Sequence, residues 1–222
     1  MPTLKIMSIK QNDLQTLSGK HVILIPIRSF SDSKSRLSNV LDSASRTAFM
    51  LECATRVIAA AGTVPIAIVT SDPEVREFAA GKEIPVIQDS GKGLNAAVQH
   101  AFDLLRPAGV LHVTVAHADL PLAKDLTTLI KDGAFTIVPD RKCDGTNVIS
   151  LPTKDYFQFS YGPMSFGRHL AEATRIKLDI TIDDNPELSM DIDTPADYEE
   201  LTAGGAFGIL DSDTSSEQNH SR

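Results

Sequence analysis

The chain lacks three features that would assign it to a class at once: a long apolar run, a cysteine framework and an excess of positive charge. No apolar run reaches the roughly 20 residues needed to cross a bilayer, and the N-terminus has no apolar stretch typical of a secretion signal. The two cysteines, Cys53 and Cys143, lie far apart and form no C-x-x-C pair. A disulfide framework and a cysteine zinc site are therefore disfavoured, and we expect a reduced, soluble, cytoplasmic protein without a membrane partner.

Positive charge is also in deficit. Lys and Arg number 21 against 29 Asp and Glu, which gives a net charge of −8. Non-specific binding of DNA or RNA requires a basic surface, so we expect no nucleic-acid partner. A local basic pocket for a small phosphorylated ligand remains compatible with an acidic chain. The motifs G-x-x-x-x-G-K-[ST], G-x-S-x-G and H-E-x-x-H are absent, which argues against a P-loop, a nucleophile-elbow hydrolase and a zincin.

The length of 222 residues is sufficient for one large domain with a sizeable core. Residues 1–19 are polar and mixed, and we expect a flexible lead-in there. Residues 204–222 have too few apolar side chains to offset the entropy of ordering, which predicts a disordered polar tail. Residues 20–203 are then expected to form a single domain.

Short apolar runs alternate with helical periodicity through this domain, which predicts an α/β fold around a mostly parallel sheet. The pattern places strands at 21–27, 66–69, 84–87, 110–115 and 134–138, and helices at 45–61, 73–80, 94–105 and 121–130. The alternation weakens afterwards, which favours an antiparallel extension with strands at 148–151 and 156–159 and helices at 166–174 and 195–201.

Ligands of such sheets bind beyond the carboxyl ends of the strands, so the residues after each strand carry most of the information. Three cations, Arg28, Lys34 and Arg36, fall within nine positions after the first strand, with serines between them. Converging cations and hydroxyl donors suit a triphosphate. The alternative is a solvated basic loop.

Glycine and acidic residues follow other strands. Gly93 precedes a helix and lets backbone N–H groups approach a ligand, but Ala96 replaces the third glycine of a dinucleotide fingerprint, so we do not expect NAD. Asp119 follows the fourth strand, where a carboxylate can hold Mg²⁺ or simply cap a helix. Asp191 and Asp193 point to the same side of an extended segment. They complete a metal site if they meet Asp119, and otherwise form an acidic surface loop.

A further group of residues suits a small anion. Thr146 follows the fifth strand, and Gly162 and Ser165 precede a helix whose N-terminal N–H groups favour phosphate or carboxylate. Turn and capping chemistry is the alternative for each of them.

Six segments taken together are more specific than any one of them: P-I-R-x-x-x-x-x-K-S-R-L, D-x-G-x-G-L-N-x-A, A-D-L-P, P-D-R…G-T-N, Y-G-P-x-S-F-x-x-H and D-x-D-T-P. From residue 21 to residue 201 they resemble the 2-phospho-L-lactate and phosphoenolpyruvate guanylyltransferases, which make the activated phospho-acid precursor of coenzyme F-420. The resemblance implies a Rossmann-like, GT-A-like nucleotidyltransferase fold with three α/β/α layers.

The resemblance also implies roles for the residues above. Lys34 and Arg36 would hold the GTP phosphates, and we place them with Asp119 as the catalytic residues. The nucleotide-binding set that we predict is Arg28, Ser71, Asp72, Gly93 and Asn95. The metal set, for Mg²⁺, is Asp119, Asp191 and Asp193, and the set that would bind the phospho-acid is Thr146, Gly162 and Ser165. Arg28 stands where the family often has Lys, and Met164 where a Gly is common.

The expected reaction is transfer of GMP from GTP to the phosphate of a small phospho-acid, with release of pyrophosphate. Phosphoenolpyruvate is favoured as the acceptor, and 2-phospho-L-lactate and 3-phospho-D-glycerate stay open. Two rivals remain, namely a nucleotidyltransferase that uses CTP or a sugar phosphate and a regulatory module that binds GTP without turnover. The oligomeric state is open, with a homodimer as one option.

Overall fold

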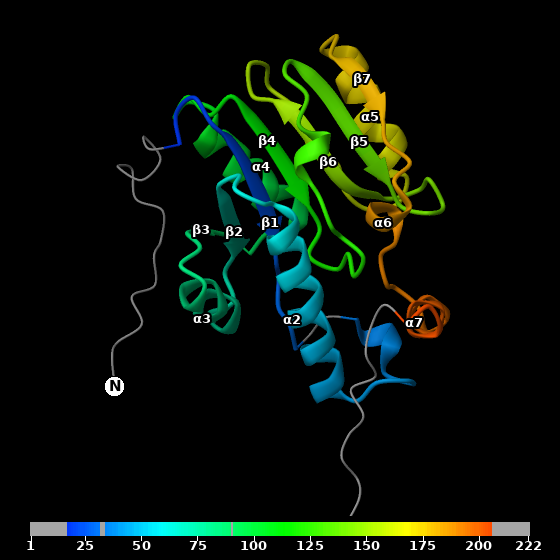
Figure 1. Cartoon of the computed structure of the whole chain (residues 1–222). Helices are drawn as coiled ribbons and strands as arrows, with labels where there is room; N and C mark the ends of the chain where they lie inside the picture. Colours follow the sequence, from blue (N-terminus) through cyan, green and yellow to red (C-terminus); the bar gives the residue numbers. More distant parts are fainter. Residues whose placement is uncertain (1–16, 32–33, 90, 206–222) are drawn as a thin grey trace, which may run out of the picture.

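The computed structural model of the chain, drawn in Figure 1, describes residues 17–31, 34–89 and 91–205. Most of the predicted lead-in and tail lie outside these residues. A seven-stranded sheet has the order β3-β2-β1-β4-β6-β5-β7. Its strands are β1 (His21–Pro26), β2 (Ile66–Thr70), β3 (Val86–Gln88), β4 (His112–Ala116), β5 (Ala134–Pro139), β6 (Thr146–Pro152) and β7 (Asp179–Ile182).

Strand β6 is the one antiparallel member of this sheet. It pairs antiparallel with both β4 and β5, while every other neighbouring pair is parallel. The predicted antiparallel extension is thus confirmed, and the extension lies inside the sheet rather than at its edge. The helices are α2 (Ser43–Ala60), α3 (Pro73–Gly81), α4 (Leu94–Leu105), α5 (Ser165–Arg175), α6 (Pro186–Ser189) and α7 (Pro195–Ala203), with short 3₁₀ helices η1 (Ser35–Leu37) and η2 (Thr127–Leu129).

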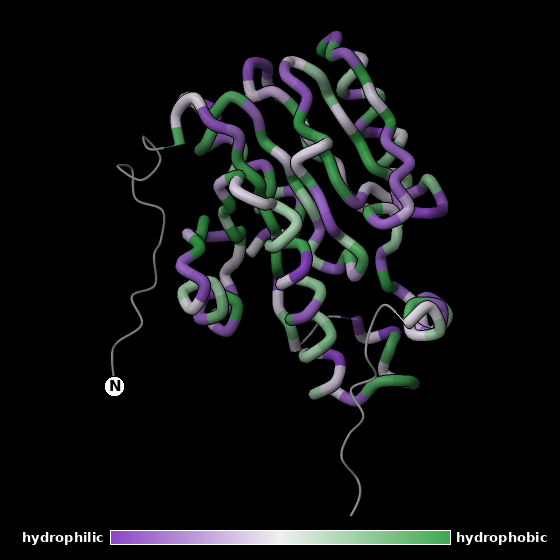
Figure 2. Tube along the Cα trace, in the orientation of Figure 1, coloured by the Kyte–Doolittle hydropathy of each residue, from purple (hydrophilic) through white to green (hydrophobic). Residues whose placement is uncertain are grey.

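Two apolar layers lie on opposite faces of the sheet, and β1 shows why. Ile23 and Ile25 pack with α2, α3 and the residues around η2, whereas Val22 and Leu24 pack with α4. A strand buried on both faces must be apolar at every position, which explains the unbroken run in the sequence. Figure 2 shows hydrophobic and hydrophilic residues alternating along α2, as expected for a helix with one side on the sheet. The three-layer α/β/α fold is therefore confirmed.

The helix predicted over 121–130 is wrong. Only η2 forms there, and the chain otherwise runs in turns. The backbone N–H of Leu126 donates to Ala60 O of α2 at 2.8 Å, and the N–H of Thr127 donates to the Asp125 carboxylate at 2.7 Å. Leu126 and Leu129 are buried three positions apart, so an irregular segment reproduces the spacing of a helix.

The strand predicted over 156–159 is also wrong, although the segment shows the burial pattern of a strand. Phe157, Phe159 and Tyr161 are buried at every second position, but residues 156–161 join no ladder of the sheet. We call residues 157–161 the clamped segment, because side chains of α4 and α5 hold its backbone. Strand β7 and helix α6 are absent from the elements predicted from the sequence.

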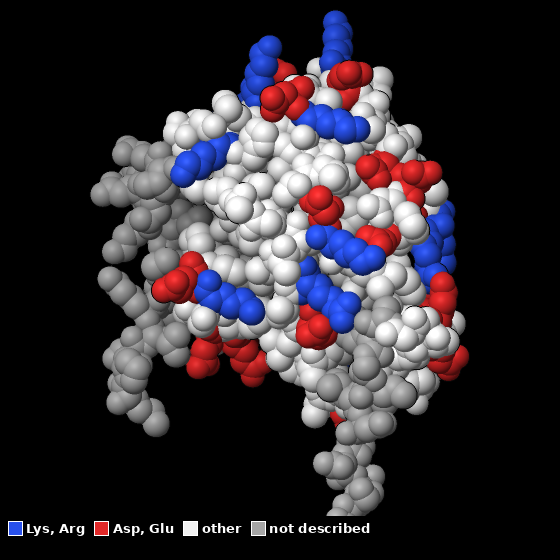
Figure 3. Space-filling model, viewed as in Figure 1, with Lys and Arg blue, Asp and Glu red and all other residues white. Residues whose placement is uncertain are grey.

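Over residues 17–31, 34–89 and 91–205, no helix combines the length and apolar character required to cross a bilayer. On the face shown in Figure 3, Lys and Arg lie beside Asp and Glu rather than in one large patch of a single charge.

Candidate active site

A cavity of about 1010 Å³ opens at the carboxyl ends of four neighbouring parallel strands. The loop after β1 contributes Arg28 and Ser29, and β2 is followed by Ser71. The loop after β3 adds Asp89, Gly91 and Gly93, and β4 is followed by His117 and Asp119. This is the position at which parallel α/β sheets bind ligands. Of the predicted site residues, the cavity is lined by Arg28, Lys34, Arg36, Ser71, Asp72, Gly93, Asp119 and Asp193.

Lys34 stands at the centre of the charged part of this cavity. Its ammonium pairs with the Asp119 carboxylate and, at 2.7 Å, with Oδ1 of Asp193, 159 residues further along the chain. Lys34 adopts the left-handed region with φ 57°, a conformation that non-glycine residues keep only where their surroundings require it. Burial would lower the pKa of Lys34, but the two carboxylates outweigh burial and raise it, so the side chain stays charged.

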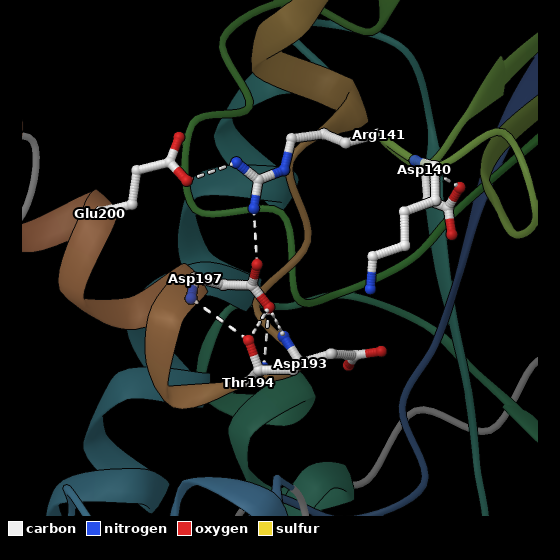
Figure 4. Close-up of polar contacts among 7 residues, drawn as sticks. Asp140, Arg141, Asp193, Thr194, Asp197 and Glu200 are labelled. Carbon is white, nitrogen blue, oxygen red and sulfur yellow. Dashed lines mark hydrogen bonds and ion pairs between the residues drawn. The ribbon is translucent and has the colours of Figure 1, made fainter.

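Asp193 reaches the cavity because the start of α7 fixes its loop, as Figure 4 shows. The backbone N–H of Asp193 donates to the Asp197 carboxylate at 3.2 Å, and Thr194 forms a reciprocal capping box with Asp197. Arg141, from the loop between β5 and β6, donates to Asp197 at 2.5 Å and to Glu200 at 2.7 Å. A capped helix end and the ion pairs of Arg141, which is distant in sequence, together hold the D-x-D segment in place.

Two carboxylates pair with the Lys34 ammonium, and the charge of a third, Asp191, interacts with all three groups. Burial would raise the pKa of Asp119, but Lys34 outweighs burial and lowers it, so Asp119 is ionised. Asp191 does not line the cavity, yet burial and the charges of Asp119 and Asp193 raise its pKa to about 6. The predicted meeting of distant carboxylates therefore occurs, with Lys34 between Asp119 and Asp193.

The residues present can accommodate a divalent cation in one respect. Oδ1 of Asp119 is buried and has no hydrogen-bond partner, and a carboxylate oxygen is the ligand type that Mg²⁺ prefers. Within the described ranges, however, no three His, Cys, Asp or Glu side chains are gathered as a metal cluster, and Lys34 bridges Asp119 and Asp193. The metal assignment to Asp119, Asp191 and Asp193 stays a prediction.

Two further cations in the cavity are uncommitted. Arg28 and Arg36 both line it, and within the described part of the chain neither forms an ion pair. Both residues are exposed. Exposed guanidinium groups beside an ionised carboxylate, in a cavity of this size, are suited to an anion with several oxygens.

Gly93 begins α4 at the cavity with φ 93° and ψ 172°, a conformation that is essentially restricted to glycine. A Cβ at this position would meet nothing within 4 Å, so the backbone angles rather than crowding require glycine. Ser71 and Asp72 lie across the cavity, and Asp72 also caps α3 by accepting the N–H of Val75 at 3.0 Å.

Asn95 is the predicted nucleotide-binding residue that does not line the cavity. Its side-chain amide instead pairs with the backbone of Tyr161: Nδ2 donates to the carbonyl at 3.1 Å, and Oδ1 accepts the N–H at 2.5 Å. Gln99, one turn later on α4, holds the segment in the same way, donating to Phe157 O at 3.2 Å and accepting the N–H of Phe159 at 3.1 Å.

Helix α5 holds the other side of the clamped segment. Nε2 of His169 accepts the N–H of Ser160 at 2.9 Å, and Glu172 accepts the N–H of Gln158 at 3.0 Å. The N–H groups of 158 and 160 thus face α5, and those of 159 and 161 face α4. This alternation is that of a strand, with side chains in place of neighbouring strands. These side chains supply the hydrogen-bond partners that the backbone N–H groups would have had in the predicted β-ladder.

The predicted acceptor residues lie together outside the cavity, with Thr146 and Ser165 buried and Gly162 exposed. Thr146 and Ser165 have exposed fractions of 3% and 1%, and the Ser165 hydroxyl donates to Thr146 Oγ1 at 3.2 Å. Gly162, with φ 111°, turns the chain from the clamped segment toward α5. Met164, next to Ser165, is 70% exposed.

Sequence reasoning missed some residues of this region. His117 is not among the site residues predicted from the sequence, yet it lines the cavity, and its buried Nε2 has no hydrogen-bond partner among the described residues. His169 appeared only as a letter of a motif, although it joins Ser160 to Thr146, whose Oγ1 lies 3.1 Å from Nδ1. Position after a strand would have indicated His117, whereas nothing in the sequence alone indicates the contacts of His169.

Comparison with known proteins identifies the family of this chain. Residues 21–208 match the family model described as guanylyl transferase CofC like. The chain is 33% identical over 192 residues to a 2-phospho-L-lactate guanylyltransferase of Methanocaldococcus jannaschii, covering 84% of each chain. It is 32% identical over 191 residues to a phosphoenolpyruvate guanylyltransferase of Rubrobacter xylanophilus, covering 82% of this chain and 93% of the relative.

Solved structures extend the comparison at the level of fold. A nucleotidyl transferase from Methanothermobacter superposes with a TM-score of 0.59 at 13% identity, covering 84% of this chain and 98% of that one. This likeness concerns the fold, whereas the match over residues 21–208 and the curated relatives concern the family. The resemblance seen in the sequence motifs is thereby confirmed, and the chain belongs to the guanylyl transferase CofC-like family of nucleotidyltransferases.

Proposed function

We propose that this chain transfers GMP from GTP to the phosphate of a small phospho-acid, with phosphoenolpyruvate favoured as the acceptor and 2-phospho-L-lactate as the main alternative. One observation carries the proposal: a cavity of about 1010 Å³ at the strand ends combines Arg28 and Arg36, which form no ion pair with any described residue, with the Lys34–Asp119–Asp193 group. The relatives' names supply the two acceptors, each of which is stated for that relative alone.

In the proposed step, an oxygen of the acceptor phosphate forms a bond to the α-phosphorus of GTP. The bond from the α-phosphorus to the bridging oxygen of the β-phosphate breaks, and pyrophosphate leaves with that electron pair. A phosphate monoester has its second pKa near ~6, so the nucleophile is already largely dianionic at neutral pH. The reaction therefore needs no general base.

The protein's task is then to hold two anions together and to stabilise the leaving group. Arg28 and Arg36 are free to neutralise phosphate oxygens, and Lys34 stays positively charged despite its burial. Gly93 leaves backbone N–H groups at the start of α4 open to the nucleotide. We assign the acceptor's anionic group to the cluster of Thr146, Gly162 and Ser165, next to the start of α5.

A divalent cation, taken as Mg²⁺, would be held by Asp119 and Asp193, with Asp191 beside them. When bound, it would supply Lewis-acid neutralisation of phosphate oxygens. Asp119 offers the unpartnered Oδ1 for this purpose. In the absence of the cation, the Lys34 ammonium already keeps the two carboxylates from repelling one another.

The direct test is incubation of the protein with GTP, Mg²⁺ and each of the three phospho-acids separately, followed by the mass of the product. The expected product is the guanosine diphospho-ester of one acid, formed together with one equivalent of pyrophosphate. CTP, ATP and UTP in the same assay, and a sugar phosphate as acceptor, test the rival transferases. Tight GTP binding without pyrophosphate would instead support the regulatory module and refute the proposal.

Asp119→Asn tests the assignment of the charged group. Loss of one such electrostatic contact typically lowers the rate ~10²–10³-fold, and we expect a loss of that size in kcat. Asp132→Asn is the matched control, because the Asp132 side chain is 95% exposed and lies outside the cavity. Near-normal turnover of Asp119→Asn would remove Asp119 from the mechanism.

A further inference from the structure

We infer that His169 is a positioning residue, which fixes the direction of the Thr146 hydroxyl and makes it a hydrogen-bond donor to the acceptor's anionic group. The inference rests on the proposed function, because Thr146 is assigned there to the phospho-acid. His169 has an exposed fraction of 0% and contacts no part of the nucleotide cavity. It acts on the site only through its neighbours.

The two ring nitrogens of His169 have different partners. Nε2 lies 2.9 Å from the backbone N–H of Ser160, and a backbone N–H can only donate. Nε2 must therefore be the unprotonated nitrogen of a neutral ring. The proton is then on Nδ1, which lies 3.1 Å from Oγ1 of Thr146. A backbone contact thus selects the tautomer, and the tautomer makes Nδ1 the donor to Thr146.

The surroundings of His169 agree with a neutral ring. Burial, followed by the charge of Arg168, lowers the pKa of His169 to about 3. Tyr161 packs edge-on against the ring at 4.9 Å between centroids, and Phe157 lies at 6.0 Å. The ring therefore keeps one protonation state and one orientation at neutral pH.

The consequence falls on Thr146. Its Oγ1 accepts from Nδ1 of His169 and from the hydroxyl of Ser165 at 3.2 Å. With both lone pairs used, the hydroxyl can act further only as a donor. No acceptor for that proton is found among the described residues. A ligand oxygen that accepts this hydroxyl proton must carry a lone pair, as the carboxylate and phosphate oxygens of a phospho-acid do.

His169 also ties together three segments that are distant in sequence. It contacts Ser160 of the clamped segment and Thr146, the first residue of β6, directly. Through Thr146 it is linked to Ser165 at the start of α5. A change at His169 therefore alters the hydroxyl pair without touching Lys34, Asp119 or the two uncommitted arginines. The expected signature is an effect on the acceptor's KM and not on that of GTP.

Two substitutions separate positioning from packing. His169→Asn places an amide nitrogen near the position of Nδ1 and keeps a donor for Thr146, but it loses Ser160. His169→Gln reaches the position of Nε2 and keeps an acceptor for Ser160, but it loses Thr146. We expect His169→Gln to raise the KM of the phospho-acid at least tenfold, and His169→Asn to restore most of that loss. The KM of GTP should change less than threefold in both.

The matched control is Glu172→Ala. Glu172 lies on the same helix and holds the same clamped segment through Gln158, but it makes no contact with Thr146. The Glu172→Ala substitution should lower thermal stability without raising the KM of the phospho-acid. If the acceptor's KM follows the loss of stability through all three variants, His169 has only a structural role and the inference is overturned.

A measurement on the unsubstituted protein covers the case in which the variants do not fold. Nitrogen-15 NMR of histidine-labelled protein distinguishes the two neutral tautomers. We expect the His169 proton on Nδ1 at neutral pH, and a proton on Nε2 would overturn the inference. If the unsubstituted protein uses none of the phospho-acids, the proposed function fails separately, and the tautomer measurement still decides the direction of the hydrogen bond.

Discussion

Removal of the Lys34 charge should destabilise the free protein more than removal of either carboxylate that it contacts. The side chains of Lys34 and Asp119 have exposed fractions of 9% and 19%. In Lys34→Met a similar apolar chain replaces the ammonium and leaves Asp119, Asp191 and Asp193 without a shared cation. Breaking a buried pair in this way typically costs ~3–5 kcal/mol, and we expect a loss of that size.

Asp119→Asn should lower the free energy of unfolding far less than Lys34→Met does. Lys34 keeps Asp193, and the substitution also removes one of three neighbouring negative charges. We expect a change within about 1 kcal/mol, and the double variant should be more stable than Lys34→Met alone. A protein with an ordinary unfolding free energy of ~5–15 kcal/mol stays folded in each case.

Urea unfolding followed by circular dichroism, with EDTA present, measures these free energies. A second series with Mg²⁺ then tests the cation site without an activity readout. A cation at 100 times its Kd stabilises the folded state by ~2.7 kcal/mol, and we expect Lys34→Met to regain about that much. The reasoning is refuted if Lys34→Met costs under about 1 kcal/mol, or if the double variant equals the sum of the single ones.

Three further predictions concern single residues. Ser165→Ala should raise the KM of the phospho-acid in steady-state kinetics and leave that of GTP nearly unchanged, and the reverse pattern would reassign this cluster. Gly93→Ala should lower stability by ~1–3 kcal/mol in urea and raise the KM of GTP, because its angles are closed to alanine; an unaltered protein would exclude strain there. Burial lowers the pKa of His112 to about 4, below the ~6.5 of an unfolded chain. The stabilisation of the folded state by neutral His112 is therefore complete above pH ~6.5. As the pH falls toward 4, the free energy of unfolding decreases by up to ~1.4 kcal/mol per pH unit. His112→Gln should remove this part of the pH dependence.

The sequence sufficed for the parts of the fold that periodicity encodes. The run from His21 is apolar throughout because β1 is buried on both faces, so its strand could be predicted without knowing its neighbours. The antiparallel place of β6 between β4 and β5 could be expected only as an extension, since register depends on tertiary pairing. Burial at every second residue, at Phe157 and Phe159, wrongly predicted a strand. The sequence does not show whether backbone groups form hydrogen bonds with a neighbouring strand or with side chains.

The candidate site could likewise be predicted from the sequence only in part. Placement after strands was enough to gather Arg28, Gly93 and Asp119 at one cavity, because parallel strands end at one edge. That Lys34 would lie between Asp119 and Asp193 depends on the left-handed backbone of Lys34 and on the capped helix that begins just after Asp193, which is 159 residues further along the chain. Asn95 was assigned to the nucleotide by resemblance, and only the structure shows its amide engaged with Tyr161.

The backbone amides of residues 158–161 should show an unusual pattern of hydrogen exchange. In a sheet, protection is lost in blocks, because opening one strand frees every N–H along its edge. Here the four protons rest on four separate anchors, Glu172, Gln99, His169 and Asn95. Each anchor can be removed by one codon change, so protection at this stretch can be dissected amide by amide in a way that no β-ladder allows.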